Sequence, residues 1–229
     1  MKNKYFILGI IFVIIALIQI TAFATPSTQI WNPSTDIQAY NTMHLGIDNY
    51  FNPLNGAFPV DLGLTYGLTP GLEIGIDAFY PQNSPIAFNA KYGFMENGYL
   101  PAFAVGLFGF GTQSGVTDQN VVYGVLAKTI YFNQFLLGRF SAGYFWGNEQ
   151  VLRNPENAKD NSGAILTWER AIGDKLWVCI DYASSRSSLG ALFYGFSWAF
   201  SSNTSVIFGY GTFNNGSNQT FTTQLDINI

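Results

Sequence analysis

The chain is poor in charged residues: Asp, Glu, Lys and Arg fill only 10% of its 229 positions, against roughly 25% in soluble domains. The wetted face of a secreted β-sandwich needs many such residues, so their shortage argues against a soluble all-β protein. Long apolar runs are also scarce. Beyond the N-terminal region no stretch approaches the ~18 consecutive apolar residues of a membrane-spanning helix, which excludes a helical inner-membrane protein.

Cysteine and histidine occur once each, as Cys179 and His44. A single cysteine cannot form an internal disulfide, and we interpret it as a small buried residue. Asp226, near the end of the sequence, is the acidic residue that we expect to reach His44, but no nucleophile is identifiable, so we expect no enzyme and rank a hydrolase last. Without Lys2 and Lys4 the chain carries 8 basic and 14 acidic residues, a net charge of −6. This acidic excess argues against a nucleic-acid partner.

The N-terminus has the three parts of a secretory signal. Lys2 and Lys4 form a positive start, residues 5–20 are apolar, and Ala22-Phe23-Ala24 is a small-x-small cleavage site. We therefore predict a signal peptide over residues 1–24 and a mature chain from Thr25. An uncleaved membrane anchor is the alternative, but the apolar run is short for one.

From Phe58 to Tyr80 the chain alternates between two kinds of side chain, interrupted by a turn at Thr69-Pro70-Gly71. Large apolar residues take one face, and small or polar residues, among them Asp61 and Asp77, take the other. A strict period of two is typical of a β-strand whose faces meet different surroundings. Its length matches the roughly 9–11 residues with which a tilted strand crosses a bilayer.

The same pattern recurs along the chain and predicts twelve strands. They cover residues 42–51, 57–68, 71–80, 86–95, 99–110, 120–132, 135–147, 162–172, 175–184, 189–200, 204–213 and 220–229. Tight turns such as Asn133-Gln134 alternate with longer connections such as residues 148–161. This alternation is typical of outer-membrane barrels with short periplasmic turns and longer outer loops, and an even strand number puts both termini in the periplasm. We predict an all-β, up-and-down transmembrane barrel over residues 40–229.

Nearly the whole mature chain resembles bacterial outer-membrane β-barrel proteins. In that group the last strand usually alternates hydrophobic residues and ends in an aromatic residue, which the outer-membrane insertion machinery reads. Here the strand from Phe221 keeps the alternation but ends in Ile229. Residues 27–36, followed by Asp48-Asn49-Tyr50, resemble the start of a group of small predicted outer-membrane proteins without assigned activity. The resemblance implies an outer-membrane location, lipid contacts and insertion by that machinery.

Aromatic residues gather near the predicted strand ends, as the interfacial girdles of a barrel require. The candidates for these girdles are Tyr66, Tyr80, Tyr92, Tyr99, Tyr144, Trp146, Trp168, Tyr182 and Trp198.

The alternation also predicts which ionisable residues face the lumen. They are His44, Asp48, Asp61, Glu73, Asp77, Lys91, Lys128, Arg139, Glu169, Asp181 and Asp226. The strand of residues 120–132 is apolar on both faces, and we place Gly124 and Lys128 inward. Pairing the strands brings Asp48, Asp61 and Asp77 together, with Glu73 and Lys91 below them. It puts Lys128 beside Arg139, followed by Glu169 and Asp181 on the next two strands.

Three interpretations of these lumen charges stay open. They form a salt-bridged network that closes the barrel, line a conducting constriction whose transverse field orients ionic solutes, or hold a cation. No loop has the ligand spacing of a calcium site, so we predict neither a metal nor a cofactor.

Two segments outside the strands also have open interpretations. Residues 25–39 hang in the periplasm or plug the lumen, with Ile30 and Trp31 as the anchor. The loop of residues 148–161 folds inward, presents a binding surface or is a solvated outer loop. The function we expect is a monomeric, passive, porin-like channel for small polar solutes or ions. The alternative is a closed structural or surface-binding barrel that works through its outer loops.

Overall fold

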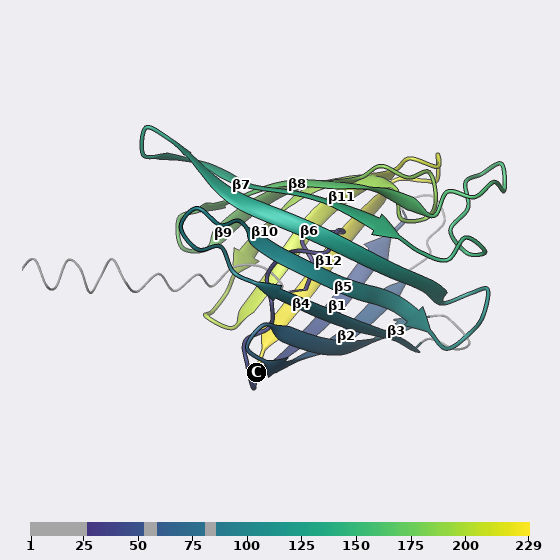
Figure 1. Cartoon of the computed structure of the whole chain (residues 1–229), viewed down its shortest axis with the longest axis horizontal. Coiled ribbons are helices and arrows are strands. Elements are labelled where there is room, and N and C mark those ends of the chain that lie inside the picture. The colour runs from purple at the N-terminus through teal and green to yellow at the C-terminus, as the bar shows by residue number, and fades with distance from the viewer. Residues whose placement is uncertain (1–26, 53–58, 81–85) are drawn as a thin grey trace, which may run out of the picture.

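The computed structural model describes residues 27–52, 59–80 and 86–229, so the predicted signal peptide lies outside the described residues. Twelve antiparallel strands form one closed ring, in which β12 returns to pair with β1 (Figure 1). The strands are β1 (Met43–Phe51), β2 (Val60–Thr69), β3 (Leu72–Tyr80), β4 (Ile86–Phe94), β5 (Ala102–Gly111), β6 (Asp118–Phe132), β7 (Phe135–Trp146), β8 (Ser162–Ile172), β9 (Leu176–Ala183), β10 (Ala191–Ala199), β11 (Thr204–Phe213) and β12 (Thr220–Asn228). The predicted barrel and its strand number are confirmed.

Among the residues that the structure describes, no helix is long and apolar enough to cross a membrane.

The two ends of the barrel differ in their connections. At one end, called the turn end here, consecutive strands are joined by short turns, such as the one after β6. There Asn133 and Gln134 both have positive φ, 46° and 68°, which matches the twist of the flanking strands. The other end, called the loop end, carries the longest described connection, residues 147–161. The chain enters β1 and leaves β12 at the turn end.

Every second side chain of each strand points away from the interior. Large apolar side chains take many of these outward positions. Ile76, Leu126 and Ile180 are each more than 40% exposed there. Six of the nine predicted girdle aromatics are exposed and three are partly exposed. They lie toward both ends of the barrel, with Tyr80 and Trp146 near the loop end. Their role at membrane interfaces stays a prediction.

Two hydrophobic clusters occupy part of the interior. One joins Val121, Tyr123, Val125, Phe145, Leu152, Ile165 and Ala183, and the other joins Ile30, Trp177, Cys179, Ala191, Phe193 and Ile207. Cys179 is thus a small buried residue, as we interpreted it. The clusters make the interior near β6 to β11 less polar than the alternation pattern indicated.

The first cluster also corrects the assignment of β6. The prediction that Gly124 and Lys128 face the lumen is wrong, because the buried residues of this strand are the alternate ones, Val121, Tyr123, Val125 and Ala127. The first three pack around Leu152 of the long loop connection, which is fully buried. The inward face of β6 is therefore apolar, since it meets other apolar side chains and not water.

Candidate functional site

Residues 27–39, called the lumen segment here, lie inside the ring of strands. The segment folds back on itself: Thr28 and Pro33 form an antiparallel bridge, and the Ser34 N–H donates to the Ser27 carbonyl over 3.2 Å. Most of its side chains contact the wall, and Gln29, Ile30, Asn32, Ser34, Thr35 and Gln38 are buried. The segment therefore forms a hairpin within the barrel.

The tip of this hairpin is held by one buried carboxylate of the wall. Asp181, on β9, accepts hydrogen bonds from the backbone N–H groups of Ile30, Trp31 and Asn32 over 2.8 to 3.1 Å, and from Asn32 Nδ2 over 2.7 Å. Converging N–H donors offset the cost of burying an ionised carboxylate. The partners of Asp181 come from the segment and not from a neighbouring strand.

Aromatic packing holds the same tip. The Trp31 ring stacks on Phe193 with a centroid distance of 4.9 Å and contacts Tyr50 and Phe213 edge-on. Its Nε1 donates to the Leu189 carbonyl over 2.8 Å. Such aromatic pairs each contribute about 0.5–1.5 kcal/mol beyond their burial.

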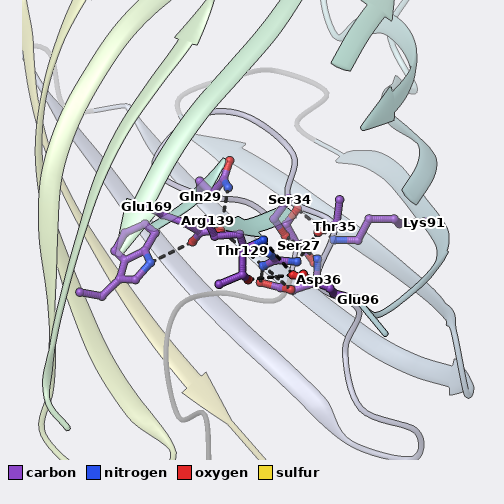
Figure 2. Close-up of polar contacts among 11 residues, drawn as sticks. Ser27, Gln29, Ser34, Thr35, Asp36, Lys91, Glu96, Thr129, Arg139 and Glu169 are labelled. Carbon is purple, nitrogen blue, oxygen red and sulfur yellow. Dashed lines mark hydrogen bonds and ion pairs between the residues drawn. The ribbon is translucent and has the colours of Figure 1, made fainter. Parts of the chain in front are cut away.

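The descending arm of the hairpin forms an ion-pair cluster with β7 and β8. Arg139 Nη1 lies 2.8 Å from Asp36 Oδ1 and 3.3 Å from Glu169 Oε1, and Nη2 donates to Thr35 Oγ1. Glu169 also accepts from Trp177 Nε1 over 2.9 Å. Figure 2 shows Arg139 among Thr35, Asp36 and Glu169. The side chains of Arg139 and Glu169 thus meet on the side of the wall that contacts the lumen segment.

A second ion pair holds the base of the hairpin. Lys91 Nζ lies 3.3 Å from Glu73 Oε1, and both side chains are 2% exposed. Glu73 also accepts hydrogen bonds from Ser27 Oγ over 2.7 Å and from the Gln38 N–H over 2.6 Å. Lys91 donates to the Ser27 carbonyl. The register pairs Glu73 with Lys91, as strand pairing from the sequence indicated.

An acidic face lies on β1 to β3, nearer the loop end than Glu73. Asp48 on β1 stands directly opposite Asp61 on β2, and Asp77 on β3 is paired with Gly63, two residues along from Asp61. Asn89 Nδ2 donates to Asp77 over 2.8 Å. Within the described residues, no Lys or Arg forms a salt bridge with these three aspartates.

The acidic face borders a cavity of about 620 Å³. The cavity lies between the lumen segment and the wall, and extends from His44 and Asp226 toward the loop end, where Asn218 borders it. In the described part of the chain, no group of three or more His, Cys, Asp or Glu side chains could hold a metal ion. Asp48, Asp61 and Asp77 make one part of the cavity lining acidic, and apolar side chains such as Phe108 and Ile165 line other parts.

Lys128 lies elsewhere. It faces Phe140 in the register, on the outward side of the ring, and its Nζ lies 2.8 Å from Glu96 Oε1 in the β4–β5 turn. The pair of cations predicted for Lys128 and Arg139 does not form, because Thr129 is the residue opposite Arg139. Partial burial raises the pKa of Glu96, but hydrogen bonds from Lys128 and Thr129 outweigh it and hold this pKa below its ordinary value.

The single histidine belongs to a small polar cluster near the turn end. His44 Nε2 lies 3.4 Å from Asp226 Oδ1, the partner that the sequence put within reach. Its Nδ1 lies 3.2 Å from Asn228 Oδ1, and Ser205 Oγ donates to Asp226 over 3.4 Å. Ser205 bonds to the carboxylate and not to the imidazole, so the cluster lacks the nucleophile-to-base contact of a hydrolase.

The long connection of residues 147–161 has two parts. Its buried Leu152 reaches into the interior cluster. Its charged residues are exposed and pair near the surface: Lys159 with Glu149 over 2.7 Å, and Glu156 with Arg186 of the next connection over 2.9 Å. The hydrogen bond and charge of Lys159 lower the pKa of Glu149, and the hydrogen bond from Arg186 lowers the pKa of Glu156.

Sequence reasoning missed Asp36 and Thr35 as partners of the wall, because they lie in a polar segment without strand period. One signal pointed to them: Arg139 was assigned inward without enough acidic partners on its own strands. An inward arginine in a barrel requires a counter-charge, and Asp36 is the acidic residue of the polar segment that enters the lumen.

No family model matches the chain, and no curated protein matches it in sequence. Solved structures do resemble it. The KdgM porin superposes with a TM-score of 0.55 at 9% identity, covering 80% of this chain and 98% of that one. The fold is that of outer-membrane porin-like barrels. The NanC porin (TM-score 0.52, 10% identity, 80% and 98% coverage) and Omp33 of Acinetobacter baumannii (0.51, 10%, 82% and 98%) are similar to the same degree.

Proposed function

We propose that the protein is a passive, porin-like channel for small polar solutes or ions in the outer membrane. The observation that carries this proposal is the cavity of about 620 Å³ beside the lumen segment, inside a closed ring with an apolar outer face. A barrel that served only as an anchor would need no such space. The fold shared with the NanC and KdgM porins supports the proposal.

The acidic face determines which ions we expect the channel to favour. Asp48, Asp61 and Asp77 line the cavity without a basic partner in the described structure, whereas Lys91 and Arg139 each have acidic partners. A lumen lined by charge of one sign raises the local concentration of counter-ions. We therefore infer a preference for cations. Export by a signal peptide over residues 1–24, insertion by the outer-membrane machinery and a monomeric state complete the proposal.

The test is single-channel conductance of the refolded mature protein in a planar bilayer, with ion selectivity taken from the reversal potential in a salt gradient. We expect openings with a preference for cations. The triple variant Asp48→Asn, Asp61→Asn and Asp77→Asn should lose nearly all of this preference. Asp174→Asn, in the exposed β8–β9 turn, is the matched control and keeps the preference. A folded, heat-modifiable barrel that stays electrically silent would count against the channel.

A second candidate is a closed barrel that works through its loop end. The filling of the interior by the lumen segment and two hydrophobic clusters favours it. The exposed charges of residues 147–161 and Arg186 would then form the working surface. Silence of the wild-type protein and of variants that weaken the segment would favour this candidate over the channel.

A further inference from the structure

We propose that the lumen segment is a releasable gate, which closes the barrel in the state described here and opens it by leaving through the turn end. This proposal rests on the channel proposed above and concerns its regulation. The inference comes from the path of the segment, from its unpaired polar atoms and from the independence of the wall.

The path of the hairpin permits withdrawal without threading. Its base lies near the turn end, where Ser27 and Gln38 bond to Glu73, the second residue of β3. Its tip, Trp31, lies deeper in the barrel, among aromatic residues near the loop end. Both arms lead to the turn end, so the hairpin can slide out there as one piece. The cavity beside it provides the room for this movement.

The closed state leaves polar atoms unpaired. Gln29 Oε1 and Gln38 Oε1 on the segment, and Ser141 Oγ and Thr167 Oγ1 on the inward faces of β7 and β8, are buried without a hydrogen-bond partner in the described structure. Burying such an atom unpaired is costly, and water entering after withdrawal would restore its hydrogen bond. The unpaired atoms thus weaken the closed state against the open one.

The wall does not need the segment. The ring closes through β1 and β12, and every strand pairs with two neighbours. The chain before β1 adds a single bridge to the sheet, from Tyr40 to Gly67. A Cβ at Gly67 would collide with the Ala39 carbonyl, so this glycine lets the base of the hairpin lie close against β2. The segment can leave while the barrel stays intact.

The native cysteine reports whether the segment moves. Cys179 is 1% exposed and packs with Ile30 of the segment. A water-soluble cationic thiol reagent, 2-(trimethylammonium)ethyl methanethiosulfonate, should reach it only after the hairpin withdraws. The experiment measures the labelling rate of Cys179 by mass spectrometry in the refolded full mature chain, alongside bilayer conductance of the same samples.

Three variants weaken different anchors: Asp36→Asn at Arg139, Asp181→Asn at the tip, and Trp31→Ala at the aromatic stack. We expect each to raise the labelling rate about tenfold or more, since each removes charge-assisted hydrogen bonds or aromatic contacts made in the closed state.

The matched controls are Asp174→Asn, an exposed turn residue, and Trp198→Ala on the outward face. Asp36→Glu keeps the charge and should label more slowly than Asp36→Asn. Heat-modifiability checks that each variant is folded. In Asp36→Asn, Arg139 still has its ion pair with Glu169.

The two readouts separate this proposal from the channel. Faster labelling with more frequent openings supports both. Faster labelling of silent barrels supports a segment that moves, and overturns the channel. Labelling that stays at the wild-type rate in all three folded variants overturns the gate, and the channel then stands or falls on its conductance alone.

Discussion

Two clusters of buried charge on the wall of the lumen differ in how their members are paired. On the side of β7 to β9, Arg139, Glu169 and Asp181 each have several partners, supplied partly by the lumen segment. On the side of β1 to β3, Asp48 and Asp61 face each other without a basic partner in the described structure. The paired charges hold the segment against the wall, whereas the aspartates repel one another and give their part of the cavity a negative potential.

The largest effect should come from the ion pair at the base of the hairpin. Lys91→Met leaves Glu73 charged and buried, and we expect a loss of roughly 3 kcal/mol in the free energy of unfolding. Urea titration followed by tryptophan fluorescence in lipid vesicles measures it. Lys175→Met, at an exposed turn position, is the control and should change little. A loss below about 1 kcal/mol would show that the pair does not hold the hairpin base.

On the paired side, removing one negative charge should also destabilise. Glu169→Gln loses the ion pair with Arg139 and weakens the bond from Trp177. We expect about 1.5–2 kcal/mol of destabilisation in the same titration, because hydrogen bonds to charged groups are stronger than neutral ones. Glu156→Gln, from an exposed loop pair, serves as the control. Equal small effects for both variants would remove the distinction between the two sides.

On the unpaired side, the same exchange of acid for amide should have the opposite sign. Asp61→Asn relieves repulsion from Asp48 and Asp77 without losing a salt bridge within the described residues. We expect a gain of about 0.5–1 kcal/mol in the free energy of unfolding. The contrast with Glu169→Gln is the sharpest test of the comparison. Destabilisation by Asp61→Asn would mean that this carboxylate has a structural partner.

The smallest effect concerns Glu96, at the turn end and outside both sides of the lumen. Its pKa is held below the ordinary value of 4.5 by Lys128 and Thr129, against the opposing effect of its burial. A carboxyl whose pKa is lowered by folding stabilises above its unfolded pKa, and this contribution disappears as the pH falls through the folded pKa.

Glu96→Gln should therefore cost about 0.2–0.5 kcal/mol at pH 7 and nothing at a pH below the folded pKa. Urea titrations of the variant and the wild type at several pH values check this. A difference between them that does not change with pH would assign the effect to packing and not to charge.

The strands of the barrel wall could be predicted from the sequence, but the contacts inside the lumen could not. Period-two alternation and turn chemistry are local signals, so they predicted the strands, the ring and the inward positions of Asp61 and Glu169. The errors lie where the two faces look alike: on β6 both faces are apolar, and parity then depends on Leu152, which arrives from a distant loop. The lumen segment has no period at all, and its place depends on contacts with β9 and β7 that no local pattern encodes.

The seam between β1 and β12 determines the order in which this protein can assemble. Met43 and Ile229 exchange backbone hydrogen bonds over 2.8 to 2.9 Å, so the last residue of the chain pairs with the first residue of β1. This contact has the highest sequence separation in the sheet, and such contacts are entropically the slowest to form. The hairpin of residues 27–39 precedes β1, one of the two strands of this seam. We therefore expect closure of the β1–β12 seam to be a late step of folding, so that barrels captured before it should have a sheet with an open edge.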